Sequence, residues 1–486
     1  VTNIFEYDAR GNRTRMVEAS GLAEARTTQY VYDKNNRLIQ TIGQTFLGQT
    51  PNEFIYYDAR GNVTSTVNAA GGRSVFYYDD LNRKTVEISA VGTYTKYTYD
   101  KNGNVTEIRI YENAVGVPAD GGSEEEAPGA SGGNARLTTF VYDNLNRMTS
   151  SSVHGAKSGY WNGSSWVADT AAITTTYEYD ANGNVVKLTD GYGNATYSYY
   201  DSLGRKTAQV DAEKYLTTWD YNAEGNVTRE YRFTNRVGTQ NGLVPTTATT
   251  RQALIDSSWY NLDDRFTDFT YDLNGNRLSE LRYNVLVHNG SGSQTSASAY
   301  ISYQYNGLGQ VVRKTEATSD FVDYNYDAAG RLTVESRKAY TDQTGASVTP
   351  TVDYYYNGVN NLSRTRARGS GDSAERVTMY GYDGDKLRWV ADAEGNYRQY
   401  YYDVGGRQTY DYYTRFRSDG SGGNQHDGTY TSYDALGRVS SSKQVIFTSG
   451  IGWADSGPVT QLTYNAFGDV IGTYVGGLLQ QQNQYD

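Results

Sequence analysis

The sequence contains no cysteine, which excludes disulfide bonds, thiolate metal sites and a cysteine nucleophile. Histidine is almost as scarce. The three histidines, His154, His288 and His426, lie far apart in segments that interrupt the regular pattern described below, and no paired histidine spacing typical of a zinc site occurs. We therefore expect solvated loop histidines, and we expect no metal and no cofactor.

Proline and long apolar runs are also rare. The chain has 6 prolines in 486 residues, and no apolar stretch approaches the length of a membrane span. The formal net charge of −11 makes non-specific binding to nucleic-acid phosphates unfavourable. Mean hydropathy is low at −0.70, but tyrosine and threonine are good strand formers, so we expect a folded β protein rather than disorder.

Tyrosine and glycine are abundant, with 48 and 52 residues, and they recur in one pattern. A tyrosine followed by Asp or Asn, which we call the anchor, occurs eighteen times, and six of the seventeen intervals between anchors are 21 residues. A unit of this length holds two strands and two tight turns, so the repeat is predicted to be a β-hairpin. The anchors are Tyr7, Tyr32, Tyr57, Tyr78, Tyr99, Tyr142, Tyr179, Tyr200, Tyr221, Tyr271, Tyr305, Tyr326, Tyr356, Tyr382, Tyr402, Tyr433, Tyr464 and Tyr485.

The residues after each anchor predict a tight turn. Position +4, counted from the tyrosine, is Gly in twelve copies and Asn in four, and only Lys386 departs. Gly and Asn tolerate positive φ, and the Asp or Asn at +1 can accept hydrogen bonds from amides of the turn. The clearest structural anchors are Tyr57, Asp58, Gly61, Tyr99, Asp100, Gly103, Tyr179, Asp180, Gly183, Tyr200, Asp201, Gly204, Tyr221, Asn222, Gly225, Tyr326, Asp327 and Gly330. A calcium-binding role for these aspartates would require closely spaced Gly-Gly-x-Gly-x-Asp nonapeptides, which are absent.

Position −2 is aromatic in thirteen copies, for example Phe76, Tyr97 and Trp219. Positions −2 and 0 share one face of a strand, so we expect a continuous aromatic ladder along the sheet. Cross-strand aromatic pairs stabilise a sheet. Sugar binding and electron hopping are alternative roles for such a ladder, but packing is favoured because the tyrosine keeps a fixed distance from the turn.

Longer intervals indicate insertions into the hairpins. We expect them near 41–53, 111–135, 151–172, 231–262, 283–298, 338–350, 411–428 and 444–460, within one continuous repeat segment covering 1–486. Segment 111–135 is predicted to be a flexible acidic surface loop, with Glu124 to Glu126 at a solvated tip and tolerance of substitution at Gly132. Segment 151–172, with Trp161 and Trp166, is predicted to form a hairpin, and 231–262 to hold a short helix near Ala253.

No catalytic constellation is evident. The chain lacks a G-x-S-x-G elbow, and the adjacent Asp263 and Asp264 show no sign of a pocket. The Asn-x-Thr sequons at Asn62, Asn104 and Asn226 belong to the consensus sequence of the repeat itself, so they are poor indicators of glycosylation. We therefore expect no enzymatic activity.

The phrases YDARGNVTSTVNAAGGRSVFYYDDLNRKT and YDANGNVVKLTDGYGNATYSYYDSLGRKT closely resemble the RHS/YD-repeat family. The resemblance covers the whole chain. The family includes bacterial Rhs and wall-associated polymorphic toxins, the C components of Tc toxins, and teneurins. It implies an all-β fold in which tandem hairpins form one long antiparallel sheet that spirals into a hollow shell or tube. Many relatives also carry a core region with an aspartyl self-cleavage site, but no such region is visible here, so no residue is assigned that role.

Strand number favours the same shell. About 36 strands in one sheet far exceed the roughly ten at which open twisted sheets curl or split. A propeller is the competing architecture, because two units would make a four-stranded blade. Intervals of 43, 37, 50 and 34 residues argue against blades of equal size.

The functional expectation follows from the resemblance. It is a non-enzymatic shell segment of a large exported bacterial protein that encloses and delivers a C-terminal toxin domain. Its partners would be that domain or neighbouring shell segments. The alternative is a cell-surface adhesin or extracellular filament with a cell-surface or glycan partner, and an enzyme such as a glycan hydrolase is the third. The chain begins at Val1 in mid-strand and stops at Asp486 within a repeat, which we interpret as a segment of a longer polypeptide.

Overall fold

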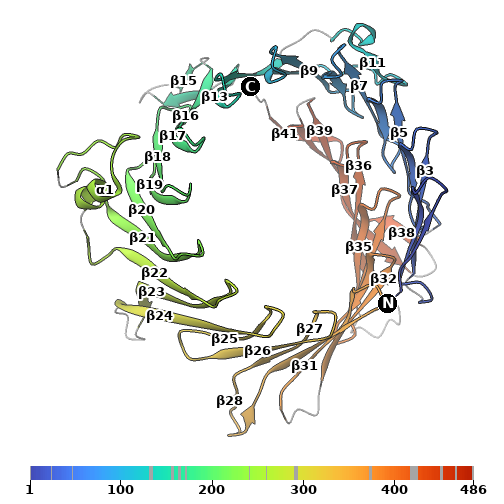
Figure 1. Ribbon diagram of the computed structural model, residues 1–486. Coiled ribbons are helices and arrows are strands. Elements are labelled where there is room, and N and C mark those ends of the chain that lie inside the picture. The colour runs from blue at the N-terminus through green and yellow to red at the C-terminus, as the bar shows by residue number, and fades with distance from the viewer. Residues whose placement is uncertain are drawn as a thin grey trace.

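The computed structural model describes residues 2–22, 25–45, 48–130, 135–154, 158–161, 166–169, 172–239, 241–258, 260–288, 294–370, 375–415, 425–448, 452–465 and 468–483. Nearly every element in these ranges is a strand (Figure 1). The strands of the first half are β1 (Ile4–Tyr7), β2 (Arg13–Glu18), β3 (Arg26–Tyr32), β4 (Leu38–Ile42), β5 (Asn52–Tyr57), β6 (Val63–Val67), β7 (Arg73–Tyr78), β8 (Lys84–Ile88), β9 (Tyr94–Tyr99), β10 (Val105–Tyr111), β11 (Gly122–Ser123), β12 (Ala135–Tyr142), β13 (Met148–His154), β14 (Ser158–Trp161), β15 (Trp166–Asp169), β16 (Ile173–Tyr179), β17 (Val185–Thr189), β18 (Ala195–Tyr200), β19 (Lys206–Val210), β20 (Tyr215–Tyr221) and β21 (Val227–Arg236).

The strands of the second half continue in the same way. They are β22 (Arg265–Tyr271), β23 (Arg277–His288), β24 (Gln294–Tyr305), β25 (Val311–Thr315), β26 (Phe321–Tyr326), β27 (Leu332–Arg337), β28 (Tyr340–Thr341), β29 (Ser347–Val348), β30 (Thr351–Tyr356), β31 (Leu362–Arg368), β32 (Arg376–Asp383), β33 (Lys386–Ala391), β34 (Tyr397–Tyr402), β35 (Gln408–Arg415), β36 (Gln425–Tyr433), β37 (Val439–Thr448), β38 (Gly452–Asp455), β39 (Thr460–Tyr464), β40 (Val470–Val475) and β41 (Leu478–Gln482). The described residues add one α-helix, α1 (Arg251–Ser258), and a single 3-10 turn, η1 (Glu124–Glu126).

Thirty-seven strands belong to one sheet. Almost every strand pairs antiparallel with the next along the chain, as in β18–β19 and β19–β20. The short β11 instead pairs parallel with β7, and β14–β15 and β28–β29 form separate two-stranded sheets. The prediction of one long antiparallel sheet is confirmed.

Each hairpin carries a β-bulge at its anchor. In β18–β19, Tyr200 pairs with Lys206 while Tyr199 pairs with Ala208, so Thr207 has no partner across the ladder. The same shift of register occurs at other anchors, for example at Tyr57 and Tyr326. A bulge bends its strand and increases the local twist. A bulge repeated in every hairpin therefore curves the whole sheet in one direction.

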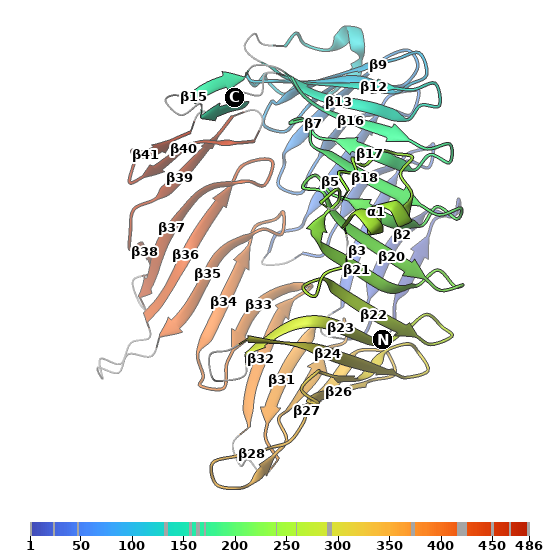
Figure 2. The same ribbon diagram turned by 90° about the vertical axis from the view of Figure 1, so that its left-hand side faces the viewer.

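The curved sheet closes into a ring and then overlaps itself (Figure 1). Strands β32–β41, the second winding, return to the side of β1–β9 and lie beside them along the axis of the ring (Figure 2). The windings touch at a seam. The Asn68 side-chain amide donates a hydrogen bond to the Ala435 carbonyl at 3.1 Å, and Arg136 forms an ion pair with Asp469. The predicted spiral shell is therefore observed, and a set of separate propeller blades is not.

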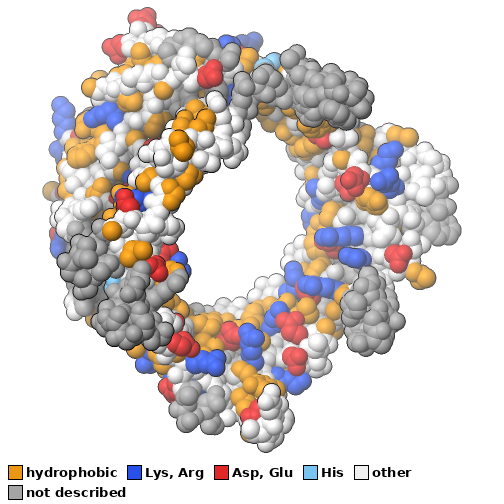
Figure 3. Space-filling view, turned by 180° about the vertical axis from the view of Figure 1, so that it is seen from behind, with side chains coloured by type: hydrophobic (Ala, Val, Ile, Leu, Met, Phe, Trp, Pro, Cys, Tyr) orange, Lys and Arg blue, Asp and Glu red, His pale blue; other side chains and the backbone are white. Residues whose placement is uncertain are grey.

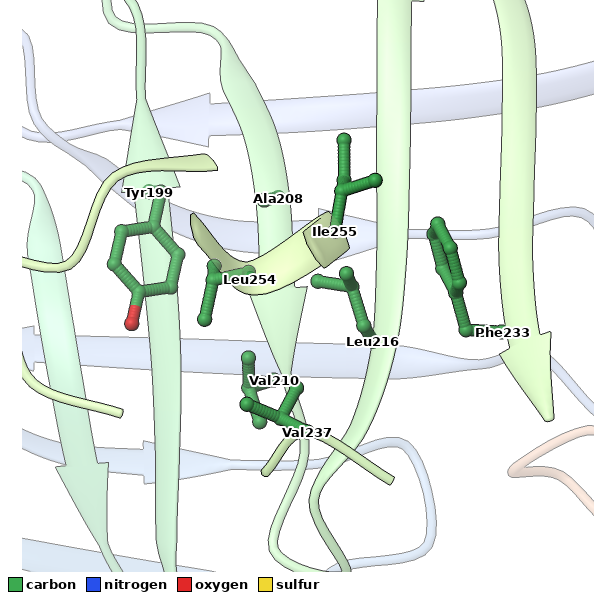
Figure 4. Close-up of a cluster of buried hydrophobic side chains, with 8 residues drawn as sticks. All are labelled: Tyr199, Ala208, Val210, Leu216, Phe233, Val237, Leu254 and Ile255. Atoms are coloured by element: carbon green, nitrogen blue, oxygen red, sulfur yellow. The ribbon is translucent and has the colours of Figure 1, made fainter. Parts of the chain in front are cut away.

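The outer face of the sheet is covered by two insertions. Leu254 and Ile255 of α1 lie over Val210, Leu216 and Phe233 of the sheet (Figure 4). Tyr199 and Ala208, at positions −1 and +8 from the anchor Tyr200, belong to the same cluster, and Val210 is at +10. Figure 1 places α1 outside the ring, so the side chains at these positions point outward. The helix predicted near Ala253 is thus confirmed.

The acidic insertion behaves differently from the prediction. Its residues Val115, Val117 and Ala127 pack against a second buried cluster on the outer face, which includes Val75 and Ile88. These apolar side chains gain burial on the sheet, so residues 111–130 form a packed cover rather than a free loop. Glu124 to Glu126 are exposed, as expected, but they form η1 directly after β11, which pairs with β7, and so they are not a free tip. Gly132 lies outside the described residues.

Other insertions extend hairpins or add small ones. Segment 151–172 contains the β14–β15 hairpin, as predicted, although the side chains of Trp161 and Trp166 lie outside the described part of the chain. Segments 283–298 and 411–428 lengthen β23–β24 and β35–β36, 338–350 adds β28–β29, and 444–460 adds β38. The remaining insertion, near 41–53, is a short loop between β4 and β5.

Candidate functional site

The turn after each anchor is organised by the carboxylate at +1. In the turn after Tyr179, Asp180 Oδ1 accepts hydrogen bonds from the backbone N–H groups of Asn182 and Asn184 at 2.9 and 2.8 Å. Its Oδ2 accepts one from the Asn184 side chain at 2.9 Å. Hydrogen bonds from the Asn184 side chain and from the backbone amides of the turn hold the pKa of Asp180 below its usual value, against the effect of burial, which raises it.

The residue at +4 closes the turn. Its φ is positive in all sixteen copies that carry Gly or Asn there, from +60° at Asn82 and Asn146 to +96° at Gly61. The exception, Lys386, is explained by a shorter hairpin, because Asp383 pairs directly with Lys386 and the positive φ moves to Gly384. The glycines of the predicted anchors, Gly61, Gly103, Gly183, Gly204, Gly225 and Gly330, have φ of +96°, +89°, +90°, +76°, +90° and +80°.

The residue at +5 links one turn to the next. Where it is arginine, as at Arg205, Nε donates to Asp201 Oδ2 at 2.7 Å and a second guanidinium nitrogen donates to the Asn222 carbonyl at 3.2 Å. The same guanidinium lies 4.7 Å from the centre of the Tyr221 ring. Where it is asparagine, as at Asn62, the amide donates to Asp58 and to Asn82 of the next turn. A glycan on Asn62 would break both contacts.

The anchor hydroxyl makes a contact that the sequence analysis missed. Fifteen anchor tyrosines donate a hydrogen bond of 2.6–3.1 Å to a carbonyl of the preceding hairpin, at its first residue beyond the turn. Among the predicted anchors, Tyr57, Tyr99, Tyr179, Tyr200, Tyr221 and Tyr326 donate to Leu38, Lys84, Met148, Val185, Lys206 and Val311. This carbonyl lies at the bulge, so the hydroxyl supplies a hydrogen bond where the ladder is interrupted.

A hydroxyl at +7 supports the other side of the bulge. Thr207 Oγ1 donates to the Tyr199 carbonyl at 3.3 Å, and Thr149 and Thr333 make the same contact in their own hairpins. The signal was present in the sequence as a recurring Thr two residues after the Asn or Arg at +5. It could have been recognised only by predicting the bulge first.

The predicted aromatic ladder is interrupted. In the regular hairpins, the residue at −2 pairs across the sheet with the residue at +9 of its own hairpin, as Phe76 does with Glu87. Between the rings of neighbouring hairpins lies the +6 side chain, and Lys84 Nζ is 5.4 Å from the Phe76 ring centre and 4.9 Å from that of Tyr97. The expectation of a continuous ladder was wrong, because strands of successive anchors are separated by the second strand of each hairpin.

These positions form the inner wall of the ring. Side chains alternate across a strand, so the anchor and −2, which share the face opposite to that covered by α1, point to the centre. Figure 3 shows that the centre is an open hole bordered by apolar, basic and acidic side chains. The inner wall is therefore an amphipathic surface of aromatic, basic and acidic groups.

The two histidines whose side chains the structure describes lie on strands. His154 and His426 lie on β13 and β36 rather than on loops, and their rings contact Thr139 and Thr414 at 2.8 and 2.9 Å. The ring of His288 lies outside the described residues. Within the described ranges, no cluster of His, Asp and Glu is arranged to hold a metal ion, and no helix there is both long and apolar enough to span a membrane.

Asp264, one of the paired carboxylates, is buried and accepts hydrogen bonds from Thr234 and Asn261, which ties an insertion to the sheet.

Comparison with solved structures gives neighbours of low similarity. They include a crystal structure of TcdB2-TccC3, at 14% identity and TM-score 0.43, in which 100% of this chain covers 28% of that chain. A structure of the same pair without the hypervariable C-terminal region gives 13% identity, TM-score 0.43, and coverage of 100% and 27%. The Photorhabdus luminescens Tc holotoxin pore gives 15% identity, TM-score 0.43, and coverage of 96% and 24%. The chain thus spans about a quarter of the length of these neighbours.

The family comparison rests on sequence. No curated protein matches the chain. Two segments, residues 167–195 and 305–343, match the model of the RHS Repeat. They contain the turns after Tyr179, Tyr305 and Tyr326, whose hydrogen bonds are the same as those of the other hairpins. The matched segments are RHS repeats, and the other described hairpins share their turn, bulge and sheet, so the described chain forms one shell segment built from repeats of this kind.

Proposed function

We propose that this shell segment is part of a large exported bacterial protein, and that it encloses a toxin domain of the same polypeptide until delivery. One observation carries the proposal: the sheet closes around an open centre, and its second winding is bonded to the first across the seam. A wall that overlaps itself in this way separates the centre from the outside around the circumference of the ring. Its partners are the enclosed domain and neighbouring shell segments. The protein acts outside the cell.

The proposed role is not enzymatic. The recurring residues are engaged in the fold: the aspartates hold turns, the tyrosines bridge hairpins, and the threonines support bulges. Catalysis would instead require polar groups that converge on a substrate and are not already engaged. The continuous repeat segment 1–486 therefore acts as a wall, with its anchors as structural residues.

A filament or adhesin is the second candidate, and the rim of the ring favours it. Leucines at the tips of anchor turns are exposed, with 70% for Leu81, 70% for Leu145, 74% for Leu203 and 78% for Leu308. At the seam, where the second winding lies on the first, the equivalent Leu436 is 44% exposed. A rim of exposed apolar turn tips is typical of a surface that binds another shell segment or another molecule, here along the axis of the ring.

Limited proteolysis of the full-length polypeptide tests enclosure. Deleting residues 180–221 removes two units while joining Tyr179 to Asn222, so the hairpin pattern stays in phase but the wall is shortened. We expect the enclosed domain to become sensitive to protease in the deleted protein and to be resistant in the unaltered one. Replacing His154, His288 and His426 together by Gln is the matched control and should leave resistance unchanged. Equal sensitivity of the domain in deleted and unaltered proteins would remove enclosure and leave the filament or adhesin.

A further inference from the structure

Three consecutive strands on the inner wall hold basic side chains against one another. Arg232 of β21 stands directly opposite Arg265 of β22, and Arg282 of β23 stands opposite Thr267, two residues further along β22. Like charges placed directly opposite each other destabilise a sheet. Residues that destabilise the fold locally are expected at functional sites.

The acidic side chains nearby do not balance this charge. Glu230 pairs with Arg232 at 2.6 Å, and Glu280 pairs with both Arg277 and Arg282. Arg265 makes no ion pair with any described residue. Four guanidinium groups therefore face two carboxylates. The contrast on the same wall is Arg398, which is neutralised by two hydrogen bonds to Asp411 at 2.7 and 2.5 Å.

These residues line a pocket of about 630 Å³. Its volume lies within the roughly 300–1,000 Å³ of ligand sites. Phe269 contributes an aromatic wall, and Glu280, with a side chain only 6% exposed, lies at the base. The side chains of Arg232 and Arg282 are 68% and 54% exposed, so their guanidinium groups are accessible from the pocket. Figure 3 shows basic side chains beside the hole, at its lower right.

We propose that this pocket binds an acidic segment of polypeptide through its carboxylates. Guanidinium groups recognise carboxylates through charge-assisted hydrogen bonds, and those of the pocket already donate single hydrogen bonds to Glu230 and Glu280. A nucleic acid fits less well, because the net charge of −11 repels a phosphate backbone. The inference rests on the proposed function for the source of the segment, which is the enclosed domain.

Fluorescence anisotropy with a labelled hexaglutamate peptide tests the pocket in the whole chain. We expect saturable binding that weakens as salt is added, no binding of hexaglutamine, and weaker binding of a thymidine hexanucleotide. Arg265→Gln should weaken hexaglutamate binding by about tenfold or more, because one charge-assisted hydrogen bond is lost. The melting temperature of the free protein should stay the same or rise, because the repulsion from Arg232 is removed. Arg398→Gln is the matched control on the same wall and should bind the peptide like the unaltered chain.

Three results would overturn the proposal: no binding of hexaglutamate, equal binding by the Arg265→Gln variant, or tighter binding of the hexanucleotide. Arg232→Gln provides a second variant with the same expected loss. Protection of an enclosed domain is scored separately by proteolysis. Loss of peptide binding in the Arg265→Gln variant with protection intact would therefore support the pocket, and failed protection with peptide binding intact would count against enclosure alone.

Discussion

The hydroxyl of each anchor tyrosine joins one hairpin to the next. Tyr200 donates to the Val185 carbonyl at 3.1 Å, across the bulge of the preceding repeat. Removing the hydroxyl leaves that carbonyl without this donor, so Tyr200→Phe should destabilise the protein by about 1 kcal/mol. Urea unfolding measures the change. Tyr192→Phe is the control, because Tyr192 is 78% exposed at a turn tip, and equal effects at the two sites would refute the role of the hydroxyl.

The glycine at +4 is required by the backbone. Gly204 has φ of +76°, where a β-branched residue is strained, so Gly204→Val should cost on the order of 1–2 kcal/mol. Gly132 lies outside the described residues, so Gly129 serves as the control in the same insertion. A Cβ added there meets nothing within 4 Å. Thermal unfolding of both variants checks the prediction, and a Gly129→Val change as large as that at Gly204 would contradict it.

The turn carboxylates predict acid sensitivity. Hydrogen bonds, of which the one from the +5 asparagine is the largest contribution, lower the pKa of Asp100, Asp180 and Asp272 below 3.8. A folded-state pKa below the unfolded value stabilises the fold above the unfolded pKa, and this stabilisation is lost as pH falls through the folded value. Stability should therefore fall below about pH 5.

Asparagine substitution tests this origin. A triple Asp100→Asn, Asp180→Asn, Asp272→Asn variant removes three titrating groups but keeps an acceptor, as Asn222 does naturally at +1. Its urea midpoint should change less between pH 5 and pH 3 than that of the unaltered chain. The same pH dependence in both proteins would assign acid sensitivity to other groups.

At the scale of elements, the two outer covers stabilise the hairpins beneath them. Leu254 of α1 is fully buried against the outer face, so Leu254→Ala should cost about 2–5 kcal/mol of local packing. We expect faster proteolysis within residues 237–258, measured by mapping early cleavage sites. Val244→Ala is the control in the same insertion, because Val244 is 70% exposed. Unchanged cleavage in the Leu254 variant would mean that the helix is held by other contacts.

The hairpin and its turn could be predicted from the sequence because they are local. Asp201, Gly204 and Arg205 act within five residues of Tyr200, and their types alone indicate the turn. The packed cover at 111–130 was mistaken for a free loop, because its run of three glutamates is conspicuous, while Val115 and Val117 reveal their role only against a sheet. The pocket around Arg265 also escaped prediction, since it depends on cross-strand register over three strands.

At the scale of the whole molecule, curvature comes from a small repeated bend. One bulge in each hairpin turns the sheet until β32–β41 meet the first strands, and short polar contacts such as Asn68 with Ala435 join the two windings. No residue marks this closure in the sequence, because it is the sum of many similar hairpins. Enclosure depends on it.

The most direct test of this closure is a disulfide across the seam. A Cβ placed on Gly405 would lie 3.5 Å from the Cβ of Ala70, within the roughly 3.5–4.5 Å of disulfides, and the chain has no other cysteine to interfere. Ala70→Cys with Gly405→Cys should form a disulfide under mild oxidation, seen as a gel shift that a reductant reverses. Ala70→Cys with Glu224→Cys, across the ring, should keep both thiols free. If the Ala70 and Gly405 cysteines also remain fully alkylatable, the sheet does not close on itself and the shell is refuted.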